Sequence, residues 1–202
     1  MEHFRDNPSL WSIDVVNEVL SDDQPIPKQP RLRESYWTKM AGIDDWPALA
    51  FRKAKQIARN RNKLRSIMNE YGINSVARQG GWRKADAMYH YCRQLRKKGV
   101  PVDGVGVQAH INIAKRDFHG VRKQFKRLGE IGLEAQITEV EAYKAMVRVC
   151  MDAANCTGVG VWGVSDDGSW LHSESRNETP LLFDSSLKKK RAFYGVKEAM
   201  QT

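Results

Sequence analysis

Two segments of the sequence end in a carboxylate directly after an apolar run. Residues 13–18, IDVVNE, end in Asn17 and Glu18, and residues 134–139, EAQITE, end in Glu139. Two carboxyl groups that flank a glycosidic bond can hydrolyse it, because one donates a proton to the leaving oxygen while the other attacks the anomeric carbon. A neighbouring charge and burial keep one such carboxyl protonated. Glu18 and Glu139 are therefore a candidate catalytic pair.

Further polar and aromatic side chains follow apolar runs in the same way. They are Asn69, Glu70 and Tyr71, then Gln108 and His110, then Glu141, and finally Trp162, Asp166 and Trp170. Amides exchange hydrogen bonds with hydroxyls in both directions, and indole faces stack on the apolar face of a pyranose ring. Each residue alone is more often a rim, capping or core residue, and Glu70 receives no role. The combination predicts a sugar site.

A repeated alternation of apolar and charged segments would bring these residues together. The β-branched runs are 13–17, 64–68, 104–110, 133–140 and 158–164, and the segments of helical periodicity are about 45–60, 83–98, 117–129, 141–154 and 188–200. This alternation predicts an α/β fold with a parallel sheet. The long polar stretches 21–35 and 165–180 follow strand-type runs, which favours an α/β barrel whose site lies on those loops. A doubly wound sheet is the alternative, but no glycine-rich phosphate loop follows a strand.

Composition narrows the partners and cofactors. The 202 residues suit one domain, expected over residues 1–202. The sequence contains no run of 18 apolar residues, so no membrane partner is expected. A net charge of +9 permits a nucleic-acid binder, but the basic residues are spread over helical segments such as 51–63 and 121–127, so no nucleic-acid partner is expected. No histidine and cysteine cluster has zinc spacing, so no metal or other cofactor is expected.

The segments that carry these residues resemble glycoside hydrolase family 10, the retaining endo-1,4-β-xylanases. The matching stretches, in order, are WSIDVVNE (11–18), LRESYW (32–37), SIMNEYG (66–72), VDGVGVQAH (102–110), QITEVE (136–141), GVGVWGVSDDGSW (158–170) and PLLFD (180–184). They are similar to the family's W-D-V-V-N-E, N-D-Y-N, D-G-I-G-x-Q-x-H, I-T-E-L-D and W-G-x-x-D-x-x-S-W motifs. The resemblance implies hydrolysis of internal β-1,4-xylosidic bonds in xylan or xylo-oligosaccharides by double displacement.

The resemblance also implies a role for each residue. Glu18 would be the general acid/base and Glu139 the nucleophile, with His110 bonded to Glu139 and steadied by Glu141. The sugar-binding residues would be Asn17 and Gln108 at the cleavage point, Trp162 and Trp170 on the glycone side, and Asn69 and Tyr71 on the aglycone side. Cys150 and Cys156 match a disulfide of secreted members. An extracellular location is implied by the family, although residues 1–10 lack the apolar core of a signal peptide.

The same matching predicts an incomplete barrel. Residues 13–18 correspond to the fourth of the family's eight strands and residues 158–164 to the eighth, so strands one to three have no counterpart. Glu141 also stands where the family usually has Asp, and Leu171 stands where a basic residue often occurs. Five parallel strands cannot close as eight do, and open edges favour self-association or incomplete folding. The alternative function is therefore an inactive or weakly sugar-binding fragment.

Overall fold

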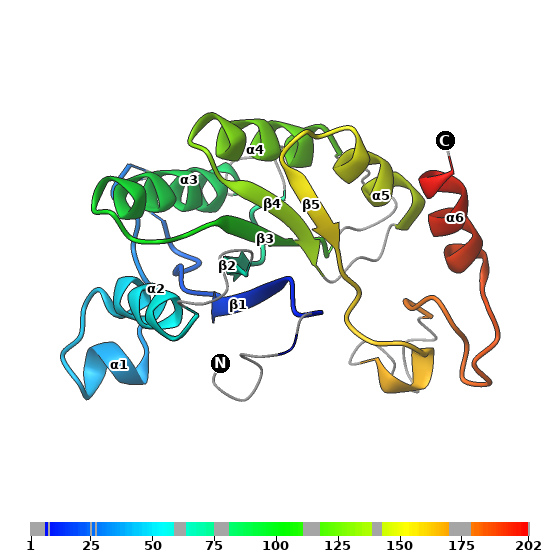
Figure 1. Ribbon diagram of the computed structural model, residues 1–202, viewed down its shortest axis with the longest axis horizontal. Coiled ribbons are helices and arrows are strands. Elements are labelled where there is room, and N and C mark those ends of the chain that lie inside the picture. The colour runs from blue at the N-terminus through cyan, green and yellow to red at the C-terminus, as the bar shows by residue number, and fades with distance from the viewer. Residues whose placement is uncertain are drawn as a thin grey trace.

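The computed structural model contains one five-stranded parallel sheet, in the order β1-β2-β3-β4-β5 (Figure 1). The structure describes residues 7, 9–24, 26, 28–58, 64–74, 81–110, 118–138, 143–169 and 179–201, with only the main chain of 81–83. The strands are β1 (Ser12–Asn17), β2 (Arg65–Glu70), β3 (Gly104–Gln108), β4 (Glu134–Thr138) and β5 (Cys156–Val159). The predicted parallel α/β architecture is confirmed.

Helices alternate with the strands along the chain. They are α1 (Tyr36–Lys39), α2 (Trp46–Ile57), α3 (Gly81–Lys97), α4 (Phe118–Glu130), α5 (Tyr143–Met151) and α6 (Arg191–Met200), and a 3-10 turn covers Asp166–Gly168. Helices α3, α4 and α5 lie on the same side of the sheet, and α6 follows beside α5 (Figure 1). No helix among the described residues is long and apolar enough to cross a membrane.

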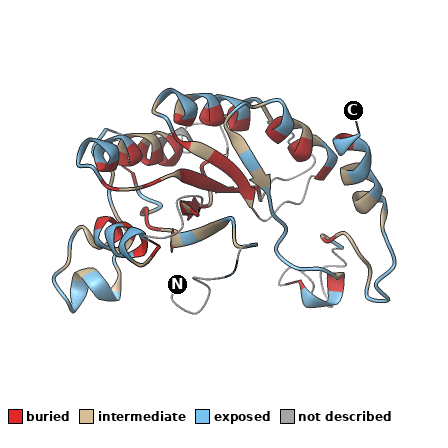
Figure 2. Ribbon diagram, viewed as in Figure 1, coloured by how far each residue is buried: buried red, intermediate tan, exposed pale blue. Residues whose placement is uncertain are grey.

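The core lies between the sheet and these helices. Every residue of β3 is buried, as are five of the six residues of β2, and the inner faces of the helices are buried with them (Figure 2). The largest fully buried side chains include Phe51 of α2, Leu95 of α3 and Phe125 of α4. Each such side chain contributes roughly 1.5–3 kcal/mol through removal of apolar surface from water. The apolar faces of the helices therefore hold them against the sheet.

Short connections lead from helix to strand. Gly99 and Gly132 have φ values of +65° and +72°, a conformation that glycine adopts without steric cost. The N–H of Val100 donates to Leu95 O at 2.9 Å, and the N–H of Leu133 donates to Leu128 O at 3.0 Å. These bonds close helices α3 and α4 sharply, so the next strand begins within a few residues.

The fifth strand is shorter than the expected run 158–164. It covers Cys156–Val159, and its pairing with β4 ends where the N–H of Gly160 donates to Ile137 O at 2.7 Å. Beyond this edge strand Gly163 turns the chain with φ +122°, and the next pairing is an isolated parallel bridge between Ser165 and Phe183. A disulfide between Cys150 and Cys156 ties α5 to the start of β5.

Candidate active site

Glu18 lies immediately after β1, at the end of the sheet toward which the parallel strands run. Its main chain has φ +54°, which is unusual for a residue other than glycine, and its N–H donates to Asn69 O at 2.9 Å. Gln108 Nε2 donates to Glu18 Oε1 at 3.2 Å, and Arg33 Nη1 donates to Glu18 Oε2 at 3.3 Å. Each carboxylate oxygen is therefore held by a different donor.

A row of hydrogen-bonded side chains crosses four strands next to Glu18. Thr138 Oγ1 donates to Asn69 Oδ1 at 2.7 Å, and Asn69 Nδ2 donates to Asn17 Oδ1 at 3.0 Å. Gln108 Nε2 also donates to Asn17 Oδ1, at 3.1 Å. The register explains the row, because Asn17 pairs with Asn69 and Gln108 pairs with Thr138. The two bonds to Oδ1 fix the amide of Asn17 with Nδ2 turned away from both donors.

Asn69 is a supporting residue in this arrangement. The residue is only 3% exposed and its amide is engaged by Thr138 and Asn17, and the sugar contact that the resemblance implies stays a prediction. Gly106 on β3 leaves the space for it, since a Cβ there would meet Asn69 Oδ1 at 2.5 Å. The row is therefore packed closely against the main chain of β3 at Gly106, as well as hydrogen-bonded along its length.

A chain of charged groups extends from Arg33 into the core. Arg33 Nη2 donates to the hydroxyl of Tyr71 at 2.8 Å, and that hydroxyl donates to Asp22 Oδ1 at 2.5 Å. Lys84 Nζ lies 2.8 Å from Asp22 Oδ1 and 3.0 Å from Glu70 Oε1. Glu70, which the sequence left without a role, also accepts from the N–H of Leu20 at 3.0 Å. The buried carboxylate of Glu70 thus anchors this series of side chains.

Local contacts move the pKa values of these groups in different directions. The hydrogen bonds from Lys84 and Tyr71 lower the pKa of Asp22, whereas burial raises the pKa of Glu70 against the opposing effect of the Leu20 N–H and Lys84. Burial alone would lower the pKa of Lys84, but Asp22 and Glu70 outweigh it and raise that pKa. Lys84 is therefore the cation that holds the two carboxyl groups together.

A cavity of about 310 Å³ opens beside Glu18. Its lining is Asn17, Glu18, Val19, Arg33, Ser35, Tyr36, Trp37 and Trp46. Two of these aromatic rings, Tyr36 and Trp37, are exposed, and Trp46 Nε1 is buried without a partner among the described residues. Exposed aromatic faces suit a sugar ring, whose apolar face stacks on them. Segment 32–37 is one of the stretches that resemble the family, but the resemblance assigns no role to its side chains.

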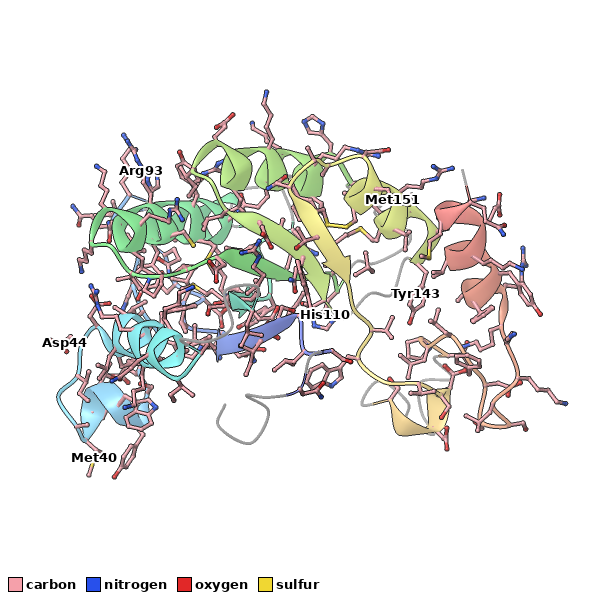
Figure 3. All side chains as sticks on the ribbon, in the orientation of Figure 1. Met40, Asp44, Arg93, His110, Tyr143 and Met151 are labelled. Atoms are coloured by element: carbon pink, nitrogen blue, oxygen red, sulfur yellow. A yellow bond between two sulfur atoms is a disulfide. The ribbon has the colours of Figure 1, made fainter. Side chains whose placement is uncertain are left out.

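Two further sequence candidates are described. His110 lies at the end of the sheet where the strands point (Figure 3), with Nε2 at 3.2 Å from Gln108 Oε1. Trp162 is 63% exposed in the segment after β5, so its ring is not enclosed by the described residues. Three candidates, Glu139, Glu141 and Trp170, lie outside the residues that the structure describes.

Comparison with known proteins identifies the family. The family model described as "Glycosyl hydrolase family 10" matches residues 1–199. The chain belongs to glycosyl hydrolase family 10. It is 33% identical to endo-1,4-beta-xylanase A of Thermoanaerobacterium saccharolyticum over 222 residues, which cover 97% of this chain and 17% of that protein.

Solved structures of family 10 agree with the fold. Xylanase 10B of Thermotoga maritima superimposes with a TM-score of 0.80 at 28% identity, over 99% of this chain and 62% of that one. Xylanase 10B of Thermotoga petrophila RKU-1, in complex with xylobiose, gives a TM-score of 0.77 at 28% identity and the same coverage. The chain therefore has the fold of a partial (β/α)8 barrel and spans less than two thirds of these family 10 relatives.

Proposed function

We propose that this family 10 chain carries a retaining endo-1,4-β-xylanase site with Glu18 as general acid/base and Glu139 as nucleophile. The observation that carries the proposal is the Glu18 carboxylate, which is one-third exposed, is gripped by Arg33 and Gln108, and lies beside the oriented amide of Asn17. The names of the relatives, and the xylobiose bound to the Thermotoga petrophila enzyme, support xylo-oligosaccharides as the substrate class.

The proposed reaction has two displacement steps. Glu139 attacks the anomeric carbon while Glu18 protonates the leaving glycosidic oxygen, which gives a covalent xylosyl ester and a shortened leaving chain. Glu18 then removes a proton from water, the water oxygen attacks the anomeric carbon, and Glu139 leaves as a carboxylate. The outward Nδ2 of Asn17 would donate to the 2-hydroxyl of the sugar at the cleavage point.

The other family residues keep the roles that the resemblance implies. Gln108 would contact the same sugar, His110 and Glu141 would steady the nucleophile, and Trp162 and Trp170 would wall the glycone side. Tyr71 would face the leaving-group side, although its hydroxyl already bonds to Arg33 and Asp22. Its contribution there would be the position of its ring.

A second candidate function is weak sugar binding without turnover. It is favoured by the exposure of Trp162 and by the two edge strands, β1 and β5, which have no outer partner among the described residues. Glycone-side contacts require an enclosed groove, and an exposed ring supplies only one face of it. Under this candidate, xylo-oligosaccharides bind weakly and no bonds are cleaved.

Reducing ends released from xylan separate the two candidates. We expect release by the wild type, and a loss of roughly 10²–10⁴-fold in Glu18→Ala because general acid–base catalysis contributes that much. Glu139→Ala should lose at least as much, and Glu34→Ala, which removes an exposed carboxylate paired with Lys39, should retain full activity. Equal background release by the wild type and Glu139→Ala, with measurable oligosaccharide binding, would favour the second candidate.

We also propose an extracellular location. The Cys150–Cys156 disulfide supports it, because disulfides persist mainly in oxidising compartments. Cell fractionation of the source organism, followed by detection with an antibody to the chain, tests this: the protein is expected in the medium or cell-envelope fraction, and recovery from the cytosol alone would contradict it.

A further inference from the structure

We infer that Arg33 is a positioning residue that fixes the carboxylate of Glu18 for proton transfer to the leaving oxygen. This inference rests on the proposed acid/base role of Glu18. It concerns a side chain from the long loop between β1 and α1, to which the sequence assigned no function. The Arg33 guanidinium contacts Glu18 directly, at 3.3 Å between Nη1 and Oε2.

The geometry of the guanidinium sets the position of the carboxylate. Arg33 uses Nη1 for Glu18 and Nη2 for the hydroxyl of Tyr71, and its centre lies 5.5 Å from the centroid of the Tyr71 ring. Because a guanidinium is planar and rigid, two bonds from different nitrogens fix its orientation. Gln108 holds the other oxygen of Glu18, so the carboxyl group is constrained from two sides.

The main chain around Arg33 is fixed as well. Its N–H donates to Val19 O at 2.7 Å, and Leu20 and Leu32 form an antiparallel bridge. Gln24, which is buried, closes the loop between them by donating to Arg31 O at 2.7 Å and accepting from the Arg31 N–H at 2.9 Å. Val19, the residue after Glu18, therefore holds the main chain of Arg33, whose side chain contacts Glu18.

The series of bonded side chains that begins at Arg33 ends in the core. Tyr71 bonds to Asp22, Asp22 to Lys84, and Lys84 to Glu70, whose side chain has no exposed surface. Lys84 also lies 3.4 Å from the centroid of the Tyr71 ring and is 7% exposed at its side chain. The charges of Asp22, Lys84 and Glu70 alternate in sign, and the hydroxyl of Tyr71 links them to Arg33, which is thereby held against a buried support.

The contact is a poor candidate for a stabilising ion pair alone. The side chains of Arg33 and Glu18 are 39% and 33% exposed, and ion pairs at such exposure add little to folding stability. Proton transfer, in contrast, depends on holding the acid within hydrogen-bond reach of the leaving oxygen. Removal of Arg33 should therefore change chemistry more than stability.

Substrates with different leaving groups test this. The 2,4-dinitrophenolate group leaves from its β-xylobioside without proton donation, whereas the phenol of phenyl β-xylobioside needs a proton to leave. In Arg33→Met we expect kcat/KM to fall at least tenfold for the phenyl substrate and less than twofold for the dinitrophenyl substrate, with partial recovery in Arg33→Lys. The control Arg31→Met removes an exposed arginine of the same loop, paired only with Asp23 among the described ion pairs, and should behave as wild type. An equal fall for both substrates, or no fall, overturns the inference.

A measurement without turnover separates this inference from the proposed function. The side-chain amide of Gln108 donates to Glu18, so its NMR resonances report the position of the carboxylate. We expect them to move in Arg33→Met and to stay unchanged in Arg31→Met. If the wild type and Glu139→Ala hydrolyse neither substrate, the proposed function fails, and these resonances then decide only whether Arg33 fixes the Glu18 carboxylate. Unchanged Gln108 resonances in Arg33→Met overturn it.

Discussion

Asn69 Nδ2 donates to Asn17 Oδ1 at 3.0 Å across the paired strands β1 and β2. Together with the bond from Gln108 Nε2, this bond sets which end of the Asn17 amide faces away from the sheet. In Asn69→Asp the shape is kept but the donor is lost, so the Asn17 amide should rotate and present its oxygen instead. We expect kcat/KM on xylan, measured below the melting transition, to fall at least tenfold, and the melting temperature to fall as well because the new carboxyl group is buried. The exposed variant Gln29→Glu adds the same charge and should leave kcat/KM unchanged, and full activity of Asn69→Asp would contradict the role of this bond.

Gly106 leaves the space that Asn69 of the same hydrogen-bonded row occupies. A methyl group at this position would meet Asn69 Oδ1 at 2.5 Å and Asn69 Cγ at 3.2 Å, so Asn69 must move or the strands must separate. Overpacking of this kind costs typically 1–3 kcal/mol. We expect Gly106→Ala to lower the free energy of unfolding by about that amount in urea titration. Gly168→Ala, where a Cβ meets nothing within 4 Å, is the matched control and should unfold at the wild-type urea concentration.

The buried pair of Lys84 and Glu70 should dominate the stability of the region below Glu18. Removing one partner leaves a buried charge without compensation, which costs about 3–5 kcal/mol. We therefore expect Lys84→Met to be strongly destabilised and the double variant Lys84→Met/Glu70→Gln to recover part of the loss. Chemical denaturation of the two single variants and the double variant measures the coupling. Strict additivity of the three values would show that the two side chains do not interact.

Cys92 offers a direct test of whether the chain folds as described. It is fully buried in α3, and burial raises the pKa of its thiol to about 12. The reactive thiolate therefore forms at pH 8 only when the chain opens. We expect negligible labelling by a thiol reagent in native buffer, one thiol per chain in denaturant and three after reduction. Rapid labelling of the native chain would indicate an open core around α3.

Reduction of the Cys150–Cys156 disulfide should destabilise the chain only moderately. The bridged cysteines are six positions apart, and closing so short a loop restricts the unfolded chain by about 2 kcal/mol. We expect the double variant Cys150→Ala/Cys156→Ala to remain folded with a free energy of unfolding lower by about that amount. Loss of all secondary structure by circular dichroism would show that the bridge is required for folding.

Strands β1 and β5 have no outer partner among the described residues, which leads us to predict self-association. The exposed apolar residues Val159, Val161, Trp162 and Val164 lie in β5 and the segment after it, and unpaired strand edges pair readily with other chains. Sedimentation velocity should therefore show species larger than a monomer. Val161→Lys, which places a charge beside this edge, should shift the distribution toward monomer. A monodisperse wild-type monomer with a sharp cooperative melt would refute the prediction.

The strands and their polar ends could be predicted because local pattern decides them. The run GVGV of β3 is apolar, all five residues of the strand are buried, and the amide of Gln108 that ends it lies where the sheet stops. The length of β5 could not be predicted, because the end of an edge strand depends on which neighbours pair with it. Nor could the contacts of Arg33 and Lys84 with the site, because one lies in an irregular loop and the other on a helix, and only the tertiary fold brings them to Glu18 and Glu70.

The left-handed main chain of Glu18 has a consequence for evolution of the site. With φ +54°, this residue holds a conformation that asparagine and glycine adopt more readily than glutamate does. Replacement by either should raise the melting temperature while removing the side chain that Arg33 and Gln108 hold. With Glu18 in its proposed acid/base role, selection for turnover and selection for stability favour different residues at this position.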